Sequence, residues 1–289
     1  MENLRGIAMM ILSMAAFAVE DAFIKFAAVE IPTGQILIFL GTTGGLFFAA
    51  LCRARGIPIL TATALHPAML MRNAGDMIGA LCFVTALSLT PLTSVSAILQ
   101  ATPLVVTMGA ALFLGEAVGW RRWSAIGAGF LGVLIVVRPG FEAFQPASLF
   151  TVCAVFALAA RDVATRKVPP GTPSLLMAVY GFVSLIPAGI LLLGVSGGAV
   201  WPSPVAWAFL CSAATVGLLA YYTIILATRL GDVSVVTPFR YSRLIFALIL
   251  GTTFFGERPD LATLSGAALI IASGLYTFLR ERRVARTPA

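Results

Sequence analysis

Ten long runs of apolar residues, separated by short polar or turn-forming segments, make up almost the whole of this 289-residue chain. An α-helix needs about 20 predominantly apolar residues to cross the hydrocarbon core of a bilayer, and each run is of that order. The pattern therefore predicts ten membrane-spanning helices and no separate soluble domain. The expected ranges are 4–28, 34–53, 67–90, 94–116, 120–138, 147–166, 173–195, 204–228, 233–255 and 261–280.

Composition supports a lipid environment. The chain is 60% hydrophobic and only 11% charged, whereas soluble domains average about 45–50% apolar and about 25% charged residues. A globular core cannot bury this much apolar surface, so the sequence predicts an all-α integral membrane protein whose partner is the lipid bilayer. The formal net charge is +7, but the basic residues lie between the apolar runs, which argues against a nucleic-acid partner.

The basic residues also predict the orientation, because positively charged loops stay on the cytoplasmic side. With the N-terminus inside, only Arg138 and Arg258 fall in outer connections. An A-x-A pattern at residues 16–18 resembles a signal-peptide cleavage site, but cleavage would remove a helix that has a counterpart later in the chain. Both termini are thus expected in the cytoplasm. The thirteen inner residues are Arg5, Arg53, Arg55, Arg72, Arg121, Arg122, Arg166, Lys167, Arg229, Arg280, Arg282, Arg283 and Arg286.

The chain repeats itself with an offset of 141 residues. Asp21 then falls on Asp162, Lys25 on Arg166, and Glu116 on Glu257, while the third and fourth runs match the eighth and ninth with an offset of 138. We therefore expect two homologous five-helix halves, 1–141 and 142–289. An odd number of spans inverts the second half, and inverted repeats are typical of secondary transporters with a central site between the halves.

Charged residues inside the apolar runs are the first candidates for that site. Glu20, Asp21, Asp76, Arg161 and Asp162 lie deep in their spans. Each charge costs about 2.5–3.5 kcal/mol near the centre of a membrane helix unless it faces a partner, a cavity or the surface. We expect these residues to line a cavity, with the carboxylates as candidates for carrying a coupling proton. Lys25 and Arg166 lie near span ends, where local pairing and snorkelling are an equal alternative.

Two runs contain proline at corresponding places. Pro103 follows Gln100 in one, and Pro238 precedes Arg240 and Tyr241 in the other. Proline removes a backbone donor, and broken helices in both halves of a transporter indicate the binding site. We therefore expect these two prolines to break or gate their helices and the three polar residues to bind substrate. The guanidinium of Arg240 suits a carboxylate or phosphate, or alternatively an ion pair with Asp162 or Asp232.

Other side chains are weaker candidates. Phe83, Tyr221 and Tyr222 lie near the middle of corresponding spans, and a tyrosine hydroxyl in hydrocarbon needs a partner. The four cysteines and the single histidine, His66, have no metal-ligand spacing, so we expect no metal and no cofactor. The stretch GAGFLG at 127–132 lies inside an apolar run, where small residues allow close helix packing. No nucleophile–base pair is present, which argues against an enzyme.

These features resemble the EamA-type members of the drug/metabolite transporter superfamily. The resemblance covers the whole chain and includes FLGE at 113–116, FFGE at 254–257 and the segment TPFRYSRLIFALILGTTFFGE at 237–257. It implies a monomeric bundle around a central cavity, alternating access and a location in the cell inner membrane. The similarity extends to the YddG-like exporters of aromatic amino acids. Residues 17–18 read Phe-Ala where many members have Trp-Gly, which departs from the family pattern in the first span.

The sequence and the resemblance together predict a secondary transporter of a small molecule, most simply an exporter of aromatic and other neutral amino acids. Uptake of a larger metabolite such as riboflavin or S-adenosylmethionine, or efflux of drugs, is the alternative within transporters. A membrane scaffold that transports nothing is the alternative from another class, and its charges would pair inside a dry bundle.

Overall fold

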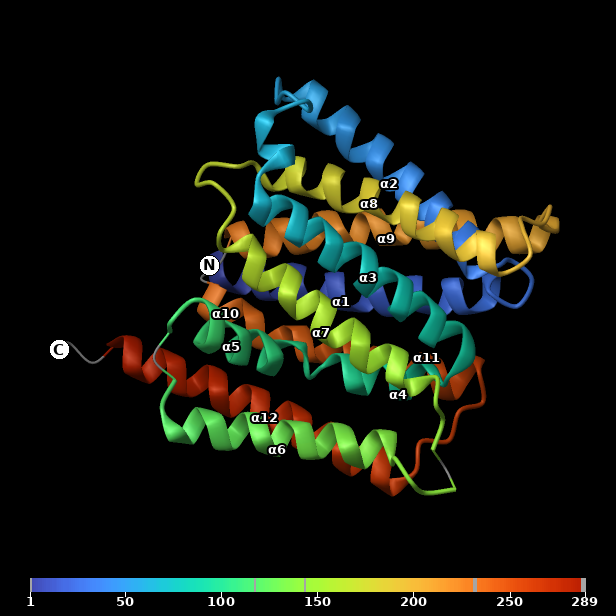
Figure 1. The fold of residues 1–289 in the computed structure, drawn as a ribbon. Coiled ribbons are helices and arrows are strands. Elements are labelled where there is room, and N and C mark those ends of the chain that lie inside the picture. The colour runs from blue at the N-terminus through green and yellow to red at the C-terminus, as the bar shows by residue number, and fades with distance from the viewer. Residues whose placement is uncertain (1, 117, 143, 231–232, 287–289) are drawn as a thin grey trace.

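The computed structural model describes residues 2–116, 118–142, 144–230 and 233–286, and every regular element in these ranges is helical (Figure 1). Nine helices within the described part are long and apolar enough to cross a membrane, when α4 and α5 are taken as one. The predicted all-α membrane architecture is therefore confirmed. The uninterrupted long helices are α1 (Glu2–Ala27), α2 (Thr33–Ala54), α3 (Pro67–Leu89), α6 (Trp120–Val137), α7 (Ser148–Thr165), α8 (Ser174–Val195), α9 (Pro204–Leu230) and α12 (Leu261–Arg286).

The two spans that contain Pro103 and Pro238 are interrupted, whereas α8 continues through Pro187. The fourth predicted span consists of α4 (Leu92–Leu99) and α5 (Thr102–Phe113), and Pro103 is the second residue of α5. The ninth consists of α10 (Val233–Val236), the 3₁₀ helix η2 (Thr237–Tyr241) and α11 (Ser242–Phe254), and Pro238 lies in η2. The missing N–H of proline fits the first turn of a helix but not its interior. Pro103 and Pro238 accordingly each lie near the start of a new helical segment.

Helix ends follow local sequence signals. Pro32 and Pro173 immediately precede α2 and α8, and Pro67 opens α3. His66 lies in a polar connection with the short 3₁₀ helix η1 (Ala62–Leu65), and its Nδ1 accepts a hydrogen bond of 3.2 Å from the backbone N–H of Ala68. The single histidine is thus the N-terminal cap of α3.

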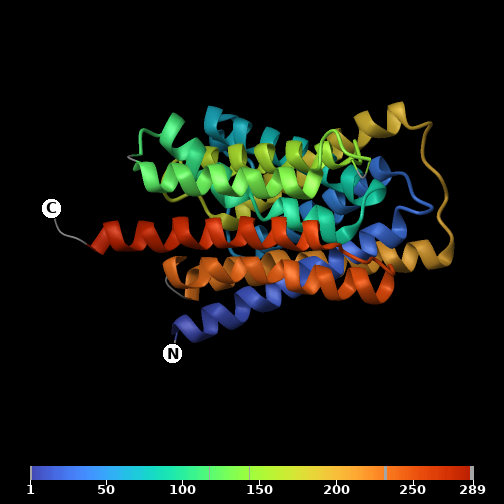
Figure 2. The ribbon, with the colours of Figure 1, turned by 90° about the horizontal axis from the view of Figure 1, so that it is seen from below.

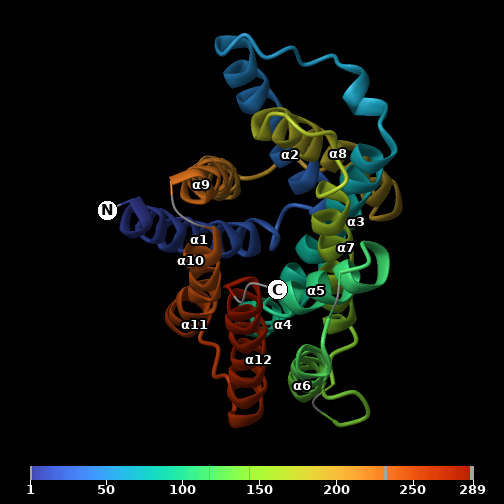
Figure 3. The same ribbon diagram turned by 90° about the vertical axis from the view of Figure 1, so that its left-hand side faces the viewer.

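The helices of the two halves alternate around the bundle instead of forming two bodies. The most extensive contacts are between α1 and α9, α2 and α8, α3 and α7, and α6 and α12. Seen end-on, α2 and α8 lie at one edge and α6 and α12 at the opposite edge (Figure 3). Each of these pairs joins a helix of residues 1–141 to a helix of residues 142–289.

We call the end of the bundle where α1 begins and α12 ends the terminal end, and the opposite end the distal end (Figure 2). The thirteen residues expected on the inner side belong to helix ends and connections at the terminal end, and Arg138 and Arg258 to the distal end. The side chains of Arg229, Arg282, Arg283 and Arg286 lie outside the described residues, as does Asp232.

At the distal end, α12 is tied to α6. Arg138, which ends α6 in a left-handed conformation (φ 54°), forms an ion pair with Asp260, and Asp260 also accepts a hydrogen bond of 2.9 Å from the backbone N–H of Thr263. The hydrogen bond from Arg138 holds the pKa of Asp260 well below its usual range. The carboxylate therefore remains charged throughout the neutral pH range, and its ion pair with Arg138 is retained there.

Two helix crossings depend on glycine. A Cβ added to Gly34 would lie 2.6 Å from the carbonyl oxygen of Gly189, and one added to Gly189 would lie 2.5 Å from that of Gly34. Gly132, the last residue of GAGFLG, and Gly266 face one another in the same way across α6 and α12. These backbones touch directly, as close packing through small residues in membranes requires.

Replacing Gly189 with leucine is expected to lower the stability of the protein by about 1–3 kcal/mol, because the side chain would force α2 away from α8. The thermal unfolding midpoint in detergent measures this. Gly194→Leu is the matched control, because it lies in the same helix with nothing within 4 Å of an added Cβ. Equal losses in both variants would contradict the direct backbone contact as the cause.

Candidate functional site

A cavity of about 200 Å³ lies where the helices of the two halves meet. Its walls come from α1, α2, α3, α4, α7, α8, α9 and α11, and they are mainly apolar and aromatic. Five charged side chains also line it: Glu20, Asp21, Asp76, Arg161 and Arg243. A concave, mostly apolar site with a few convergent polar groups is the usual form of a small-molecule binding site.

On one side of the cavity, Asp21 of α1 pairs with Arg243 of α11. The Arg243 Nη2 and Nε atoms donate to Asp21 Oδ2 at 2.6 and 3.2 Å, and Asp21 is only 1% exposed. The guanidinium also lies 5.2 Å from the ring centroid of Phe17 and 5.5 Å from that of Phe83. Arg243 is thus held by a carboxylate and two aromatic faces, which compensates for its removal from water.

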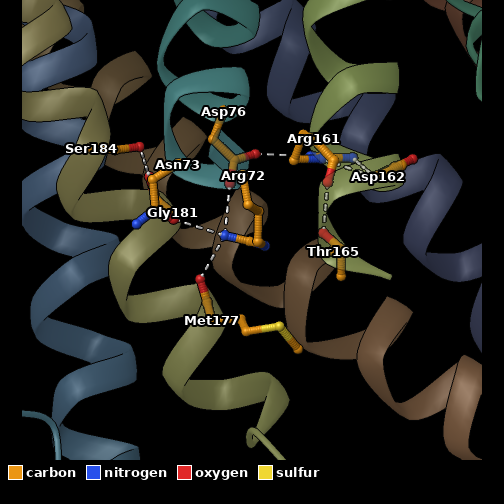
Figure 4. Close-up of polar contacts among 9 residues, drawn as sticks. All are labelled: Arg72, Asn73, Asp76, Arg161, Asp162, Thr165, Met177, Gly181 and Ser184. Carbon is orange, nitrogen blue, oxygen red and sulfur yellow. Dashed lines mark hydrogen bonds and ion pairs between the residues drawn. The ribbon is translucent and has the colours of Figure 1, made fainter. Parts of the chain in front are cut away.

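On the other side, four charged residues of α3 and α7 form a network (Figure 4). The two oxygens of Asp76 accept from Arg72 Nη1 and Arg161 Nη1, both at 3.0 Å. Arg161 also donates to Asp162 Oδ1 from Nη2 at 2.8 Å and from Nε at 2.9 Å. Arg72 donates in addition to the carbonyl oxygen of Met177 in α8 at 3.1 Å. Two positive and two negative groups balance each other in this network.

Gly181 of α8 lets the network approach that helix. A Cβ at this position would lie 2.8 Å from Asp76 Oδ2, and Figure 4 shows Gly181 directly beside the Arg72–Asp76 pair. Next to it, Tyr221 of α9 packs edge-on against Phe48 and Phe182, with ring centroids 5.4 and 5.3 Å away. The aromatic wall and the charged network therefore share one side of the cavity.

The structure brings half of the predicted site residues to the cavity: Asp21, Asp76, Phe83, Arg161 and Tyr221. Asp162 is not a lining residue, but its carboxylate pairs with Arg161, which lines the cavity. Tyr222, the neighbour of Tyr221, points elsewhere on α9, and its hydroxyl accepts from Arg55 Nη2 at 3.4 Å. Adjacent residues on a helix lie about 100° apart, so only one of the two tyrosines faces the cavity.

The polar residues at the helix breaks do not line the cavity either. Gln100 Nε2 donates to the backbone carbonyl oxygens of Tyr241 at 3.0 Å and Arg240 at 3.5 Å. The Tyr241 hydroxyl is turned toward α12, where a Cβ on Gly274 would overlap it. Gln100 therefore connects the break in one half to the break in the other.

Glu20 was expected to face a cavity and does line it, whereas sequence reasoning omitted one charged lining residue, Arg243. Arg243 was visible as a charge inside an apolar run, and that signal alone places it among the candidates. Phe17 and Phe182 carried no comparable signal, since aromatic residues in membrane helices usually pack against lipid or neighbouring helices.

Beyond the cavity, toward the distal end, Lys25 and Glu257 hold the corner between α3 and α4. The Glu257 carboxylate accepts from the backbone N–H groups of Leu92 (2.6 Å) and Thr93 (3.0 Å), and Lys25 Nζ donates to the carbonyl oxygens of Thr90 (2.5 Å) and Leu87 (3.2 Å). An acid at the start of α4 and a base at the end of α3 are the favourable placements for the two helix dipoles. We call Lys25 and Glu257 the distal clamp.

Three pairs of opposite charges in the apolar runs have i, i+4 spacing, Asp21/Lys25, Arg72/Asp76 and Asp162/Arg166, and among the described residues one of the three is an ion pair. Arg72 and Asp76 pair within α3. Lys25, in contrast, belongs to the distal clamp while Asp21 pairs with Arg243, and Arg166 pairs with Glu116 at 2.5 Å on the exposed terminal end. The i, i+4 spacing puts two side chains on one face of a helix. Asp21, Lys25 and Arg166 nevertheless bind groups outside their own helix.

A charged cavity inside a multi-pass helical bundle is typical of a membrane transporter, and the comparison with known families shows this class. The chain belongs to the EamA-like transporter family, which matches residues 4–138 and again residues 145–279. The chain is accordingly a transporter of small metabolites and not an enzyme.

The chain is similar to several transporters of known cargo. It is 24% identical over 282 residues to the S-adenosylmethionine uptake transporter of Rickettsia bellii, covering 96% of this chain and 94% of that one. It is 31% identical over 212 residues to a riboflavin transporter of Rhizobium johnstonii, covering 73% and 70%. The pseudopaline exporter CntI of Pseudomonas aeruginosa is 26% identical over 272 residues, covering 93% and 94%.

One protein of known crystal structure has a TM-score of 0.64 and 19% sequence identity with this chain, over 96% of this chain and 98% of the other. At this level of identity the likeness establishes a shared fold.

Proposed function

We propose that this protein exports amino acids or similar small zwitterionic metabolites across the cell inner membrane by alternating access. The observation that carries the proposal is the placement of two ion pairs on opposite sides of one aromatic-walled cavity, Asp21–Arg243 and Asp76–Arg161. A substrate with both an ammonium and a carboxylate group offers a partner to one member of each pair. Alternating access then requires only that these pairs rearrange around a bound substrate.

Inverted repeats supply the mechanism for alternation. The family matches twice, over 135 residues each time. The distal clamp residues Lys25 and Glu257 have Arg166 and Glu116 as counterparts at an offset of 141, and those two residues pair at the terminal end. The counterparts of the distal clamp residues thus lie at the opposite end of the bundle, as expected for halves 1–141 and 142–289 inserted in opposite directions. The basic residues at the terminal end favour placing both termini in the cytoplasm.

Uptake of a larger metabolite is the second candidate, because the similar proteins include an S-adenosylmethionine uptake transporter and a riboflavin transporter. The positive-charge bias orients the chain but does not set the direction of flux, so the same cavity serves export and uptake. Drug efflux is the broader form of this candidate. In each case the protein acts as a monomer within the bilayer, since the cavity is built from one chain.

Flux from proteoliposomes tests the function. Vesicles preloaded with amino acids, S-adenosylmethionine and riboflavin are compared with protein-free vesicles by mass spectrometry of the external medium. We expect the vesicles to lose a few amino acids selectively. If this loss is unchanged after a proton gradient is collapsed, transport is not coupled to protons. Movement of only S-adenosylmethionine or riboflavin would replace the first candidate with the second. Retention of every solute would favour a scaffold without transport.

A further inference from the structure

Glu20 is the one acid of the cavity wall without an ion-pair partner among the described residues. Asp21 is neutralised by Arg243, and Asp76 belongs to the balanced network with Arg72, Arg161 and Asp162. Glu20 lines the same cavity from α1. The five charged residues that line the cavity, three acids and two arginines, therefore carry one excess negative charge when all are ionised.

The carboxylate of Glu20 lies against α9, where a glycine leaves room for it. Gly217 of α9 faces Glu20, and a Cβ at that position would overlap the carboxylate. Arg243 cannot turn to Glu20 without loss, because its guanidinium is already bonded to Asp21 and enclosed by Phe17 and Phe83. An ionised carboxylate in a largely apolar cavity is unfavourable unless a counter-charge arrives.

The position of Glu20 in the repeat strengthens this view. At an offset of 141, Glu20 corresponds to Arg161, while its neighbour Asp21 corresponds to Asp162. Arg161 has both Asp76 and Asp162 as partners. The two equivalent positions thus carry opposite charges. Arg161 has ion-pair partners among the described residues, and Glu20 has none.

We propose that Glu20 binds a cationic group of the substrate, such as a side-chain ammonium or a sulfonium, and makes the cavity selective for metabolites with a positive charge beyond the zwitterion. The inference rests on the proposed function and narrows it from amino acids and similar zwitterionic metabolites to those with an additional positive charge. A charge-assisted contact in a low-dielectric site gives the discrimination between a cation and its neutral analogue.

Two matched pairs of compounds test the selectivity. Lysine and methionine both have unbranched side chains, of which only that of lysine is charged, and S-adenosylmethionine differs from S-adenosylhomocysteine by its sulfonium methyl group. Proteoliposome flux of each pair is compared in wild type, Glu20→Gln and Glu20→Asp. Glu142→Gln is the control, because Glu142 is an exposed residue of the α6–α7 connection.

Wild type, Glu20→Asp and the control are expected to prefer the cationic member of at least one pair. Glu20→Gln, which keeps the shape and removes the charge, should lower that preference about tenfold or more. Thermal stabilisation of the detergent-solubilised protein by the same compounds gives an independent measure of binding, and its unliganded unfolding midpoint checks that Glu20→Gln folds.

An unchanged preference in folded Glu20→Gln would overturn the inference while leaving the transport function intact. An equal loss of all fluxes in that variant, with binding preference retained, would also overturn it, because Glu20 would then serve a step common to every substrate, such as proton transfer. If the wild-type protein transports none of these compounds and no other solute, the proposed function is contradicted. The binding measurement then tests the role of Glu20 independently of transport.

Discussion

Replacing Arg243 with methionine is expected to lower the free energy of unfolding by about 3–5 kcal/mol, because it leaves the Asp21 carboxylate buried without a counter-charge. Asp21 is 1% exposed, and both of its hydrogen bonds from Arg243 end on one oxygen. The change also removes the cation that Phe17 and Phe83 enclose. The thermal unfolding midpoint in detergent and the flux of the transported solute measure the two consequences.

The double variant Asp21→Asn/Arg243→Met separates the charge from the packing. Removing both charges should restore much of the stability lost in Arg243→Met, since no unpaired carboxylate remains. Arg258→Met is the matched control, because Arg258 is exposed at the distal end. A double variant no more stable than Arg243→Met would show that the arginine stabilises the bundle by contact and not by its charge.

Glu257→Ala is expected to destabilise the protein by on the order of 3 kcal/mol, because two backbone N–H groups at the start of α4 lose a charged acceptor. The effect should be local. Hydrogen exchange of the Leu92 and Thr93 amides, which the carboxylate binds at 2.6 and 3.0 Å, should accelerate more than that of the other helices. Solute flux should change as well, since the distal clamp borders the cavity.

The repeat supplies the control for this variant. Glu116 occupies the equivalent position but pairs with Arg166 on the exposed terminal end. Exposed ion pairs contribute about 0–1 kcal/mol, so Glu116→Ala should leave stability nearly unchanged. Equal losses at the two positions would mean that Glu257 stabilises α4 no more than a surface ion pair does.

The placement of nine of the ten predicted spans could be predicted, because each apolar run must on its own be long and apolar enough to cross the bilayer. The same local rule located the intramembrane charges and the two proline breaks. It could not assign partners, since those depend on which helices meet. Asp21 illustrates the limit: Lys25 is its neighbour at i+4, but Arg243 is its partner from the other half of the chain.

The residues around the prolines show a second limit. Gln100, Arg240 and Tyr241 were expected to bind substrate, but Gln100 bonds instead to the backbone carbonyls of the other two. A polar side chain near a broken helix has two possible roles, because the break itself creates unsatisfied backbone groups. Only the relative rotation of the helices decides between them, and no single helix carries that information in its sequence.

The pairing of Asp21 with Arg243 has a consequence for biogenesis. The arginine follows the aspartate by 222 residues, so a ribosome that has inserted α1 must complete most of the polypeptide before the partner exists. Until then the nascent first half presents an unmatched carboxylate to lipid or to the insertion machinery. A chain truncated before α11 therefore lacks the counter-charge of Asp21 and retains a costly unpaired carboxylate within the membrane.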